Sequence, residues 1–410
     1  MDHKKINGID KLLAHLNTCH KGQPVFSPDN VASVNSILDN FYKQIHSSSS
    51  KIKINTFEPP LIKEIDTYHK LTNYSEISNS FVGKEIKDYI KEQSAYEIIY
   101  EHTLKHGEKI TIFFVIPEFI KSTELIDKYI VIILTWFEFI YAYSQKKCAK
   151  KLDVYIYLTP FKKMLPDAGE VIGRDHVNTA YTTSCVPKGS IIIYRNEEWF
   201  KVLIHETFHV LGLDFSHYSN TDISREMAQI FPIRSKINLF EAYTETWAEI
   251  LNCVFVSYYR TKNIKDYRSR FKRCIAIERD FALFQMSKVL GYMNLDYKDL
   301  YLNDSKSELK RLHFYKEGSN VFAYYIVTAI LLFNVDKFML WCQDNNANII
   351  KYSYSPTTNR SFMELIKNNY RSKKLLELLE CLNQINFGSE KRFLEIQRTM
   401  RMTIIDLLEN

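Results

Sequence analysis

The chain has 410 residues, which is enough for two or three domains. Apolar residues make up 46% of it and charged residues 25%, the ordinary balance of a globular protein with a sizeable core. The 54 basic and 48 acidic residues leave a net charge of +6. Over this length the excess is too small to indicate nucleic-acid binding, so no nucleic-acid partner is expected.

The seven cysteines are odd in number and scattered, and no two of them form a C-x-x-C pair. This pattern predicts reduced thiols in an intracellular protein. The N-terminus lacks the apolar region of a secretory signal peptide, which agrees with that location. The most apolar run, residues 129–143, is shorter than a membrane span and contains Glu138. We therefore expect a buried helix there and no membrane span.

In chain order, the first 90 residues predict a mainly helical region, with one or two helices from residue 61 onward. β-rich runs then begin, and Gly107 lies in the turn between the first two. The predicted elements are strands at 95–103, 109–116, 151–159, 178–184 and 190–195, and a long buried helix at 122–147. The run 178–184 is the candidate for a sheet edge that pairs with an extended peptide.

The motif His205-Glu206-Thr207-Phe208-His209 follows these strands. Residues four apart lie on one face of a helix, so both imidazoles point at the same place. A zinc ion accepts two such nitrogens, and Glu206 can take a proton from a water that the metal binds. The apolar flanks predict a buried helix with Asn196 as its N-cap and an end near Gly212. This is the H-E-x-x-H pattern of zinc metallopeptidases.

A catalytic zinc site needs a third protein ligand beside the two histidines. In the extended motif of metzincins a third histidine follows, but that position holds Phe215 here. Asp214 and His217 flank it out of phase. A site completed by His217 is therefore an alternative, and the other source of a ligand is a later glutamate.

An acidic stripe runs along the helix expected at 239–259, where Glu241, Glu245 and Glu249 stand four residues apart. Like charges repel at that spacing, and burying them costs several kcal/mol unless they are paired or bind a cation. The stripe is thus a metal-binding face or a solvated one. Its Glu245-Thr-Trp-Ala-Glu249 part resembles the pattern that follows H-E-x-x-H in gluzincins, although an aspartate is commoner there at the final position.

The gluzincin resemblance covers roughly residues 178–255, and it implies a complete site. His205, His209 and Glu245 would bind Zn²⁺, Glu206 would be the base, and Glu249 would orient a ligand histidine. The implied fold is α+β, with a zincin-like core made of a twisted sheet, the motif helix and the glutamate helix. That core would span residues 91–260, between the helical N-terminal region 1–90 and a helical C-terminal region 261–410.

The implied activity is hydrolysis of peptide bonds in a protein or peptide substrate by a zinc-bound water that Glu206 activates. A further donor usually stabilises the oxyanion. The candidates are His217, Tyr218, Tyr243, Tyr324 and Tyr325, each of which also suits a packing role. Cys185 lies near the expected cleft and is either an inhibitory thiolate on zinc or an ordinary buried thiol.

The segment 190–216 also looks like part of uncharacterised proteins from large nucleocytoplasmic DNA viruses. That resemblance implies a viral protein, located in the host cytoplasm or the virion and partnered by other viral proteins. The alternative function is a virion structural or scaffold protein that keeps a zincin fold without proteolytic activity. Glu206 favours the enzyme, since a structural metal site has no need of a base.

Overall fold

The computed structural model describes residues 8–20, 24–52, 58–77, 81–118, 122–388 and 390–407. Most of the N-terminus on which the expected absence of a signal peptide rests lies outside these ranges. Contacts between residues divide the chain into two units, each assembled from separate segments. Unit 1 holds residues 1–38, 163–177 and 218–410, and unit 2 holds 39–162 and 178–217. The three regions proposed along the sequence stay a prediction.

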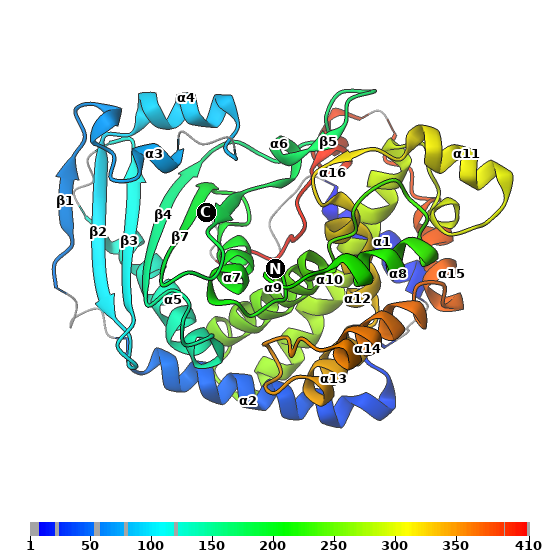
Figure 1. Cartoon of the computed structure of the whole chain (residues 1–410), viewed down its shortest axis with the longest axis horizontal. Coiled ribbons are helices and arrows are strands. Elements are labelled where there is room, and N and C mark those ends of the chain that lie inside the picture. Colours follow the sequence, from blue (N-terminus) through cyan, green and yellow to red (C-terminus); the bar gives the residue numbers. More distant parts are fainter. Residues whose placement is uncertain are drawn as a thin grey trace. The chain divides into compact units, whose positions relative to one another are not determined.

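Unit 2 is built around a sheet that has six strands within the described residues, in the order β1-β2-β3-β4-β7-β6 (Figure 1). β3, β4 and β7 run parallel, and the other neighbours pair antiparallel. The strands are β1 (Leu61–Glu64), β2 (Tyr96–Thr103), β3 (Lys109–Ile116), β4 (Lys151–Thr159), β6 (Ala180–Thr182) and β7 (Lys188–Arg195). The structure confirms the α+β class, the β2–β3 hairpin and the edge position of β6, although β6 is shorter than predicted.

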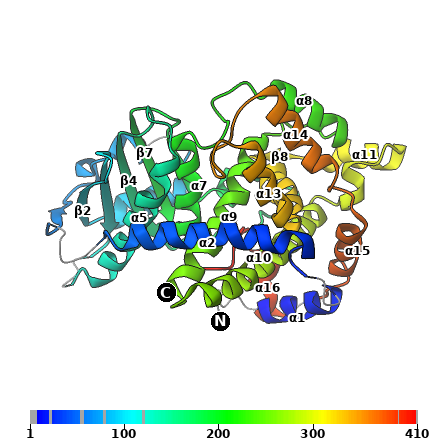
Figure 2. The same cartoon turned by 90° about the horizontal axis from the view of Figure 1, so that it is seen from below.

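Helices cover both faces of this sheet. On one face, Phe113, Tyr155 and Tyr194 pack against the segment 65–90, which contains α3 (Tyr74–Ile77) and α4 (Lys84–Gln93). On the other face lies α5 (Glu124–Ile140), which both views show beside the strands (Figures 1 and 2). Its Tyr129 ring lies 5.9 Å from the ring of Phe114. Successive side chains alternate across a strand, so each central strand contributes to two cores and is apolar almost throughout.

Two of the predicted elements in unit 2 are wrong in part. β1 lies in the stretch expected to be helical, and its pairing of Leu61 with Ile99 depends on a distant strand. Leu61 and Ile62 are adjacent, and both are exposed. β1 therefore lacks the alternation of apolar and polar residues by which a half-buried strand is recognised in a sequence. The helix expected to reach residue 147 ends at Ile140 and continues as the short 3₁₀ turn η4 (Tyr141–Tyr143).

Unit 1 is mainly helical. Its long helices α9 (Leu239–Tyr259) and α10 (Ile264–Tyr292) pack together, and the bounds of α9 are those predicted (Figures 1 and 2). The other helices of eight or more residues that lie wholly in this unit are α1 (Ile9–His20), α8 (Thr221–Ile230), α11 (Ser305–Phe314), α13 (Val335–Asn345), α14 (Pro356–Lys367) and α15 (Lys373–Leu382). The helix α2 (Val31–Ser49) contains the division between the units. Short elements of unit 1 include α6 (Arg174–Val177), α12 (Thr328–Phe333), α16 (Leu394–Arg398) and the strand pair β5 (Ile172–Gly173) and β8 (Glu317–Gly318).

The last described residues, 399–407, run through the core of unit 1 without forming a helix, although the sequence predicts helix to the end. A carboxylate oxygen of Glu278 on α10 accepts hydrogen bonds from the backbone N–H groups of Ile404 and Ile405, at 3.2 and 2.8 Å. Asn252 Nδ2 on α9 donates to the carbonyl of Ile405 at 2.8 Å. Such partners satisfy backbone groups that a helix would otherwise satisfy internally.

Two disulfides join four of the seven cysteines, so the expectation of reduced thiols throughout is wrong for these four. Cys148 pairs with Cys185 in unit 2, and Cys19 pairs with Cys381 in unit 1, across 362 residues. The fold brings the Cα atoms to 4.8 and 5.8 Å, which lies in the range that a disulfide requires. Spacing along the sequence carries no such information.

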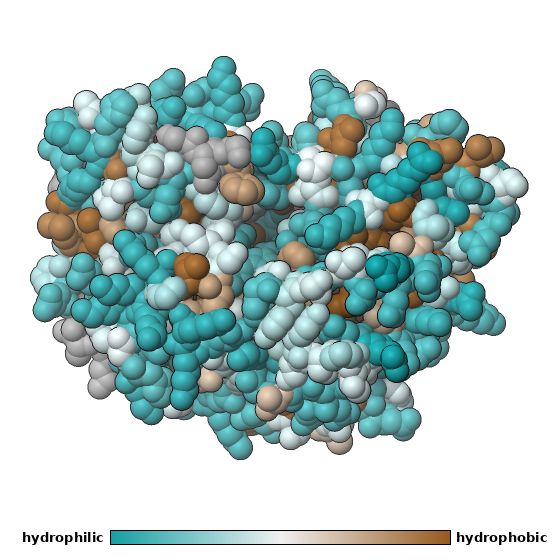
Figure 3. All heavy atoms as spheres, viewed as in Figure 1, coloured by the Kyte–Doolittle hydropathy of each residue, from teal (hydrophilic) through white to brown (hydrophobic). Residues whose placement is uncertain are grey.

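Among the described residues, no single helix is long and apolar enough to cross a membrane, while one bent pair, Phe322–Phe333 with Val335–Asn345, meets the criterion by length and composition. The apolar run at 129–143 is the buried part of α5 with η4, as predicted. Three apolar side chains of α11 are exposed: Leu309, Leu312 and Phe314. Figure 3 shows apolar surface in the region that α11 occupies in Figure 1.

Candidate metal centre

The helix α7 (Trp199–Leu211) carries the H-E-x-x-H motif and packs on β6 and β7. It also packs on α5, because Trp136 Nε1 donates a hydrogen bond to Thr207 Oγ1 at 3.1 Å. Apart from His209, every residue of α7 is buried. His209 is half-buried, and its side chain is the most exposed part of the motif.

The ends of α7 are set by two backbone positions in the left-handed region. The helix starts after Glu198, which has a φ of 59°, and the predicted N-cap Asn196 is wrong: its N–H continues the sheet by donating to Thr159 O at 3.0 Å. At the other end Gly212 has a φ of 63°, as the sequence indicates. The left-handed φ is what favours glycine here, because the nearest atom that a Cβ would meet, Gln145 Nε2 at 2.9 Å, is the end of a flexible side chain.

The imidazole rings of His205 and His209 meet at their Nε2 atoms, which lie 3.2 Å apart with the ring planes at 76°. Two nitrogens bound to one tetrahedral zinc ion at about 2.0–2.1 Å would lie about 3.3 Å apart. The pair therefore fits the nitrogen ligands of a single zinc ion. Glu206 follows the first ligand in the same turn and is 8% exposed, so its carboxylate lies in a largely dry environment.

Asp214 holds His209 from the side away from His205. His209 Nδ1 donates to Asp214 Oδ2, and the carboxylate is fully buried. Its other oxygen accepts from the N–H and the hydroxyl of Ser216, at 3.1 and 2.8 Å. With its proton on Nδ1, the His209 ring presents the lone pair of Nε2, which is the form that binds a metal.

The role of Asp214 was not predicted from the sequence, because it depends on the turn at Gly212. After this left-handed residue the chain reverses, with Gly212 N–H donating to His209 O at 3.1 Å. The reversal returns the residue two positions later to the last turn of the helix. A polar residue shortly after a helix-ending glycine is the signal that identifies such a contact.

Comparison with known proteins assigns the chain to no family. No family model and no solved structure matches the chain. Over 192 residues the chain is 25% identical to an uncharacterised protein of Acanthamoeba polyphaga mimivirus. The match covers 43% of this chain and 46% of the mimivirus protein, so the chain spans less than half the length of that relative. The resemblance to proteins of large DNA viruses is confirmed in this limited form.

The acidic stripe lies on α9, within unit 1. Glu241, Glu245 and Glu249 are 9%, 1% and 1% exposed, which excludes the alternative of a solvated face. The carboxylate of Glu241 accepts from Asn320 Nδ2 at 3.0 Å and from Tyr324 OH at 3.1 Å. Three buried carboxylates on one helix are costly unless hydrogen bonds, protons or a cation compensate their charge.

The tyrosines considered as oxyanion donors have different surroundings. Tyr243 and Tyr325 donate their hydroxyl groups to backbone carbonyls inside unit 1, at 2.7 and 2.6 Å. Burial raises the pKa of Tyr243 well above its usual value. Tyr243 and Tyr325 therefore have packing roles within unit 1. The ring of Tyr218 stacks on that of Tyr354, 4.1 Å away, while Tyr324 faces Glu241.

Two further candidates from the sequence lie in unit 2. His217 Nε2 lies 3.2 Å from Gln145 Nε2, and Gln145 in turn donates to the carbonyl of Gly212 at 2.9 Å. Cys185 is bonded to Cys148. Both interpretations of Cys185, as an inhibitory thiolate and as an ordinary buried thiol, are therefore wrong, because a sulfur atom in a disulfide is neither a thiolate nor a thiol.

Replacing Asp214 by asparagine is expected to weaken zinc binding by about 10–100-fold, because the neutral amide no longer fixes the proton of His209 on Nδ1 through a charge-assisted hydrogen bond. Zinc affinity is measured by competition with a chromophoric chelator. Asp222→Asn is the control, since that side chain is 87% exposed and makes the same change of charge. Equal zinc affinity in the two variants would show that Asp214 does not act on the metal ligand.

Proposed function

We propose that the chain is a zinc-dependent metallopeptidase of the H-E-x-x-H type, acting on a protein or peptide substrate. The observation that carries the proposal is the pair of Nε2 atoms 3.2 Å apart on a buried helix, with Glu206 between the two histidines in sequence. The finer assignment to a gluzincin-like fold rests on the sequence pattern. The mixed sheet, with α7 following β7 and an antiparallel edge strand β6, supports it.

A glutamate of α9 is proposed as the third zinc ligand. Glu245 is the first choice from the sequence pattern. Glu241 is the second choice, favoured by the contacts of its carboxylate with Asn320 and Tyr324, since metal-binding carboxylates are commonly oriented by such outer hydrogen bonds. Asp214 already orients His209, so the orienting role proposed for Glu249 would concern the other histidine.

Glu206 and Asp214 have separate roles in the proposed hydrolysis. A zinc ion, when bound, supplies a Lewis acid that polarises the peptide carbonyl and lowers the pKa of a water molecule. Glu206 accepts the proton of that water and passes it to the leaving amine. Asp214 keeps the His209 ring in the ligating tautomer throughout. The buried neighbours of Glu206 limit access of further water, which strengthens each of these interactions.

The edge strand β6 is the proposed platform for the substrate. One side of β6 pairs with β7, with Ala180 opposite Ile193, and the other side is the outer edge of the sheet. An extended peptide that adds to this edge gains backbone hydrogen bonds without regard to its sequence. Because α7 packs on β6, such a peptide would run beside the helix of the histidines.

The mimivirus resemblance supports a viral protein with viral protein partners, in the infected cell or the virion. The alternative function, a virion scaffold that keeps the fold without catalysis, uses the same two histidines. The two functions differ in what Glu206 does. A structural zinc ion is normally closed by four protein ligands and needs no base, whereas a catalytic one keeps an open position.

The test is peptide cleavage by the full chain, followed by mass spectrometry of a mixed peptide library. We expect cleavage that stops on chelation and returns on addition of one equivalent of zinc. His209→Ala, purified in the same way, should bind no zinc at this centre and should not cleave, which excludes a contaminating protease. Of Glu245→Gln and Glu241→Gln, the variant that weakens zinc binding identifies the third ligand. Zinc-loaded protein that cleaves nothing would overturn the proposal in favour of the scaffold.

A further inference from the structure

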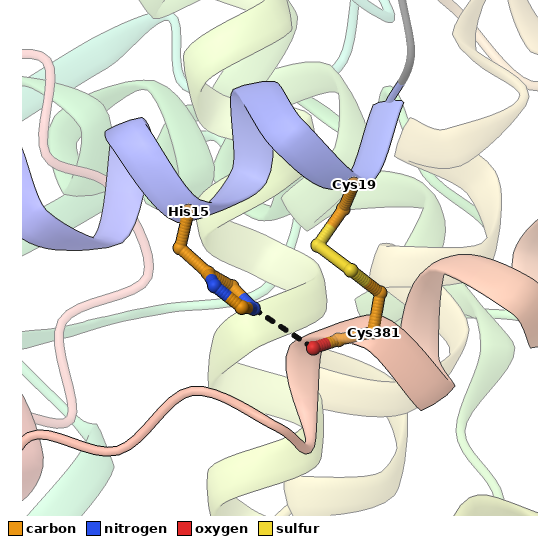
Figure 4. A group of neighbouring side chains, drawn as sticks. All are labelled: His15, Cys19 and Cys381. Carbon is orange, nitrogen blue, oxygen red and sulfur yellow. Dashed lines mark hydrogen bonds between the residues drawn. A yellow bond between two sulfur atoms is a disulfide. The ribbon is translucent and has the colours of Figure 1, made fainter.

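A second cluster of metal-binding side chains lies in unit 1, where α1 meets α15 (Figure 4). His15 and Cys19 stand four residues apart on α1, and Cys381 is on α15. A ring nitrogen of His15 and the two sulfur atoms all lie within 4.8 Å of one another. The sulfur atoms form a disulfide, and His15 Nε2 lies 2.8 Å from the carbonyl oxygen of Cys381.

The histidine adds a third metal-binding side chain to the two sulfur atoms. His15 and Cys19 lie on the same face of α1, and the His15 ring points at the carbonyl oxygen of Cys381, beside the sulfur pair (Figure 4). Two thiolates and an imidazole are the ligand types that zinc prefers. On a tetrahedral zinc ion with bonds of about 2.3 Å to sulfur and 2.0 Å to nitrogen, neighbouring ligand atoms lie about 3.5–3.8 Å apart. The observed group is within small side-chain rotations of that arrangement.

We propose that reduction of the Cys19–Cys381 disulfide converts this cluster into a zinc site held by His15, Cys19 and Cys381. A dithiol donates two electrons and two protons: the S–S bond breaks, both cysteines become thiols, and the dithiol becomes a cyclic disulfide. Zinc then displaces the two thiol protons and binds the thiolates and the imidazole. The three side chains are only half-buried, so water takes the fourth position.

The site keeps the two helices joined in either redox state. α1 is anchored in the core of unit 1 by Leu12 and Leu16, both fully buried, which holds His15 and Cys19 in place when the S–S bond is broken. In an oxidising compartment the disulfide ties α1 to α15. In a reducing compartment, where disulfides are rare, the zinc ion takes over the same connection.

The test uses the reduced full chain, prepared with dithiothreitol and desalted without oxygen, then titrated with Co²⁺ and Zn²⁺. Reduction is expected to add about one metal equivalent and a thiolate-to-cobalt charge-transfer band in the near ultraviolet. The histidine and glutamate ligands proposed for the α7 centre give no such band, so the band should persist in His209→Ala. The two metal proposals can therefore fail separately.

Variants assign the ligands. Cys381→Ser should lose the band, whereas Cys342→Ser, which removes a buried thiol of the same unit, should keep it. The double change Cys148→Ser and Cys185→Ser should also keep it, because these residues belong to unit 2. His15→Gln should weaken zinc binding at this site by at least tenfold. Reduced protein without the band, or a band that survives in Cys381→Ser, would overturn the proposal.

Discussion

Glu206→Gln is expected to lower the rate of peptide hydrolysis by about a hundredfold to ten-thousandfold, while the protein keeps its zinc. Glutamine has nearly the shape of glutamate, so the buried helix around position 206 is not forced to repack. The amide has no basic oxygen, so it cannot take the proton of the attacking water. Because the two histidines and their partner Asp214 are untouched, the metal ligands remain in place.

The measurement is kcat/KM for a peptide that the wild type cleaves, with zinc content determined on the same samples. Glu226→Gln serves as the control, since it makes the same change at an exposed position of α8. A Glu206→Gln protein that cleaves as fast as the wild type would remove Glu206 from the mechanism. A protein that has lost both zinc and activity would instead assign Glu206 to the metal site itself.

The parts of the centre that could be predicted from sequence are those set by local periodicity. His205 and His209 share a helical face wherever the segment is helical, and the apolar residues around them leave little alternative to a buried helix. The bounds of α9 follow for the same reason, because its apolar pattern ends at Tyr259 and a capping asparagine begins the next helix.

What the sequence did not predict depends on contacts that the local periodic pattern does not contain. Asp214 reaches His209 only through the left-handed turn at Gly212, and neither disulfide is visible in the cysteine spacing. The strand β1 exists because β2 offers it an edge, since its own side chains are largely exposed. In each case the partner that decides the structure lies outside the local pattern, so tertiary contacts override what the segment alone predicts.

Residues 399–407 illustrate this dependence most fully. The segment contains methionines and isoleucines that suit a helix as well as an extended chain. Its conformation is set by Glu278, which lies 126 residues before Ile404 and accepts from Thr403 Oγ1 as well as from two backbone N–H groups. A single buried carboxylate thus holds the three donors that fix the path of the chain.

Glu278→Ala is accordingly expected to lower the free energy of unfolding of unit 1 by about 2–4 kcal/mol. The side chain is fully buried, and its removal takes away the acceptor of the Ile404 N–H. The Ile405 N–H and the Thr403 hydroxyl keep only longer contacts, at 3.2 Å with Thr403 Oγ1 and at 3.4 Å with the Ile405 carbonyl. Glu278→Gln keeps one acceptor oxygen and should cost less. The exposed Glu377, which pairs only at the surface with Lys373, is the control: Glu377→Ala should change the stability by about 1 kcal/mol at most.

Amide hydrogen exchange reports on the same interaction locally. In the wild type the N–H groups of Ile404 and Ile405 are bonded to Glu278 inside the core, so they should exchange only on large-scale opening of unit 1. In Glu278→Ala they should exchange faster by a hundredfold or more, along with the neighbouring residues of the segment. If these two amides stay protected and urea unfolding is unchanged, the path of the C-terminal segment must be fixed by its apolar side chains, and Glu278 would then be a consequence of that path and not its cause.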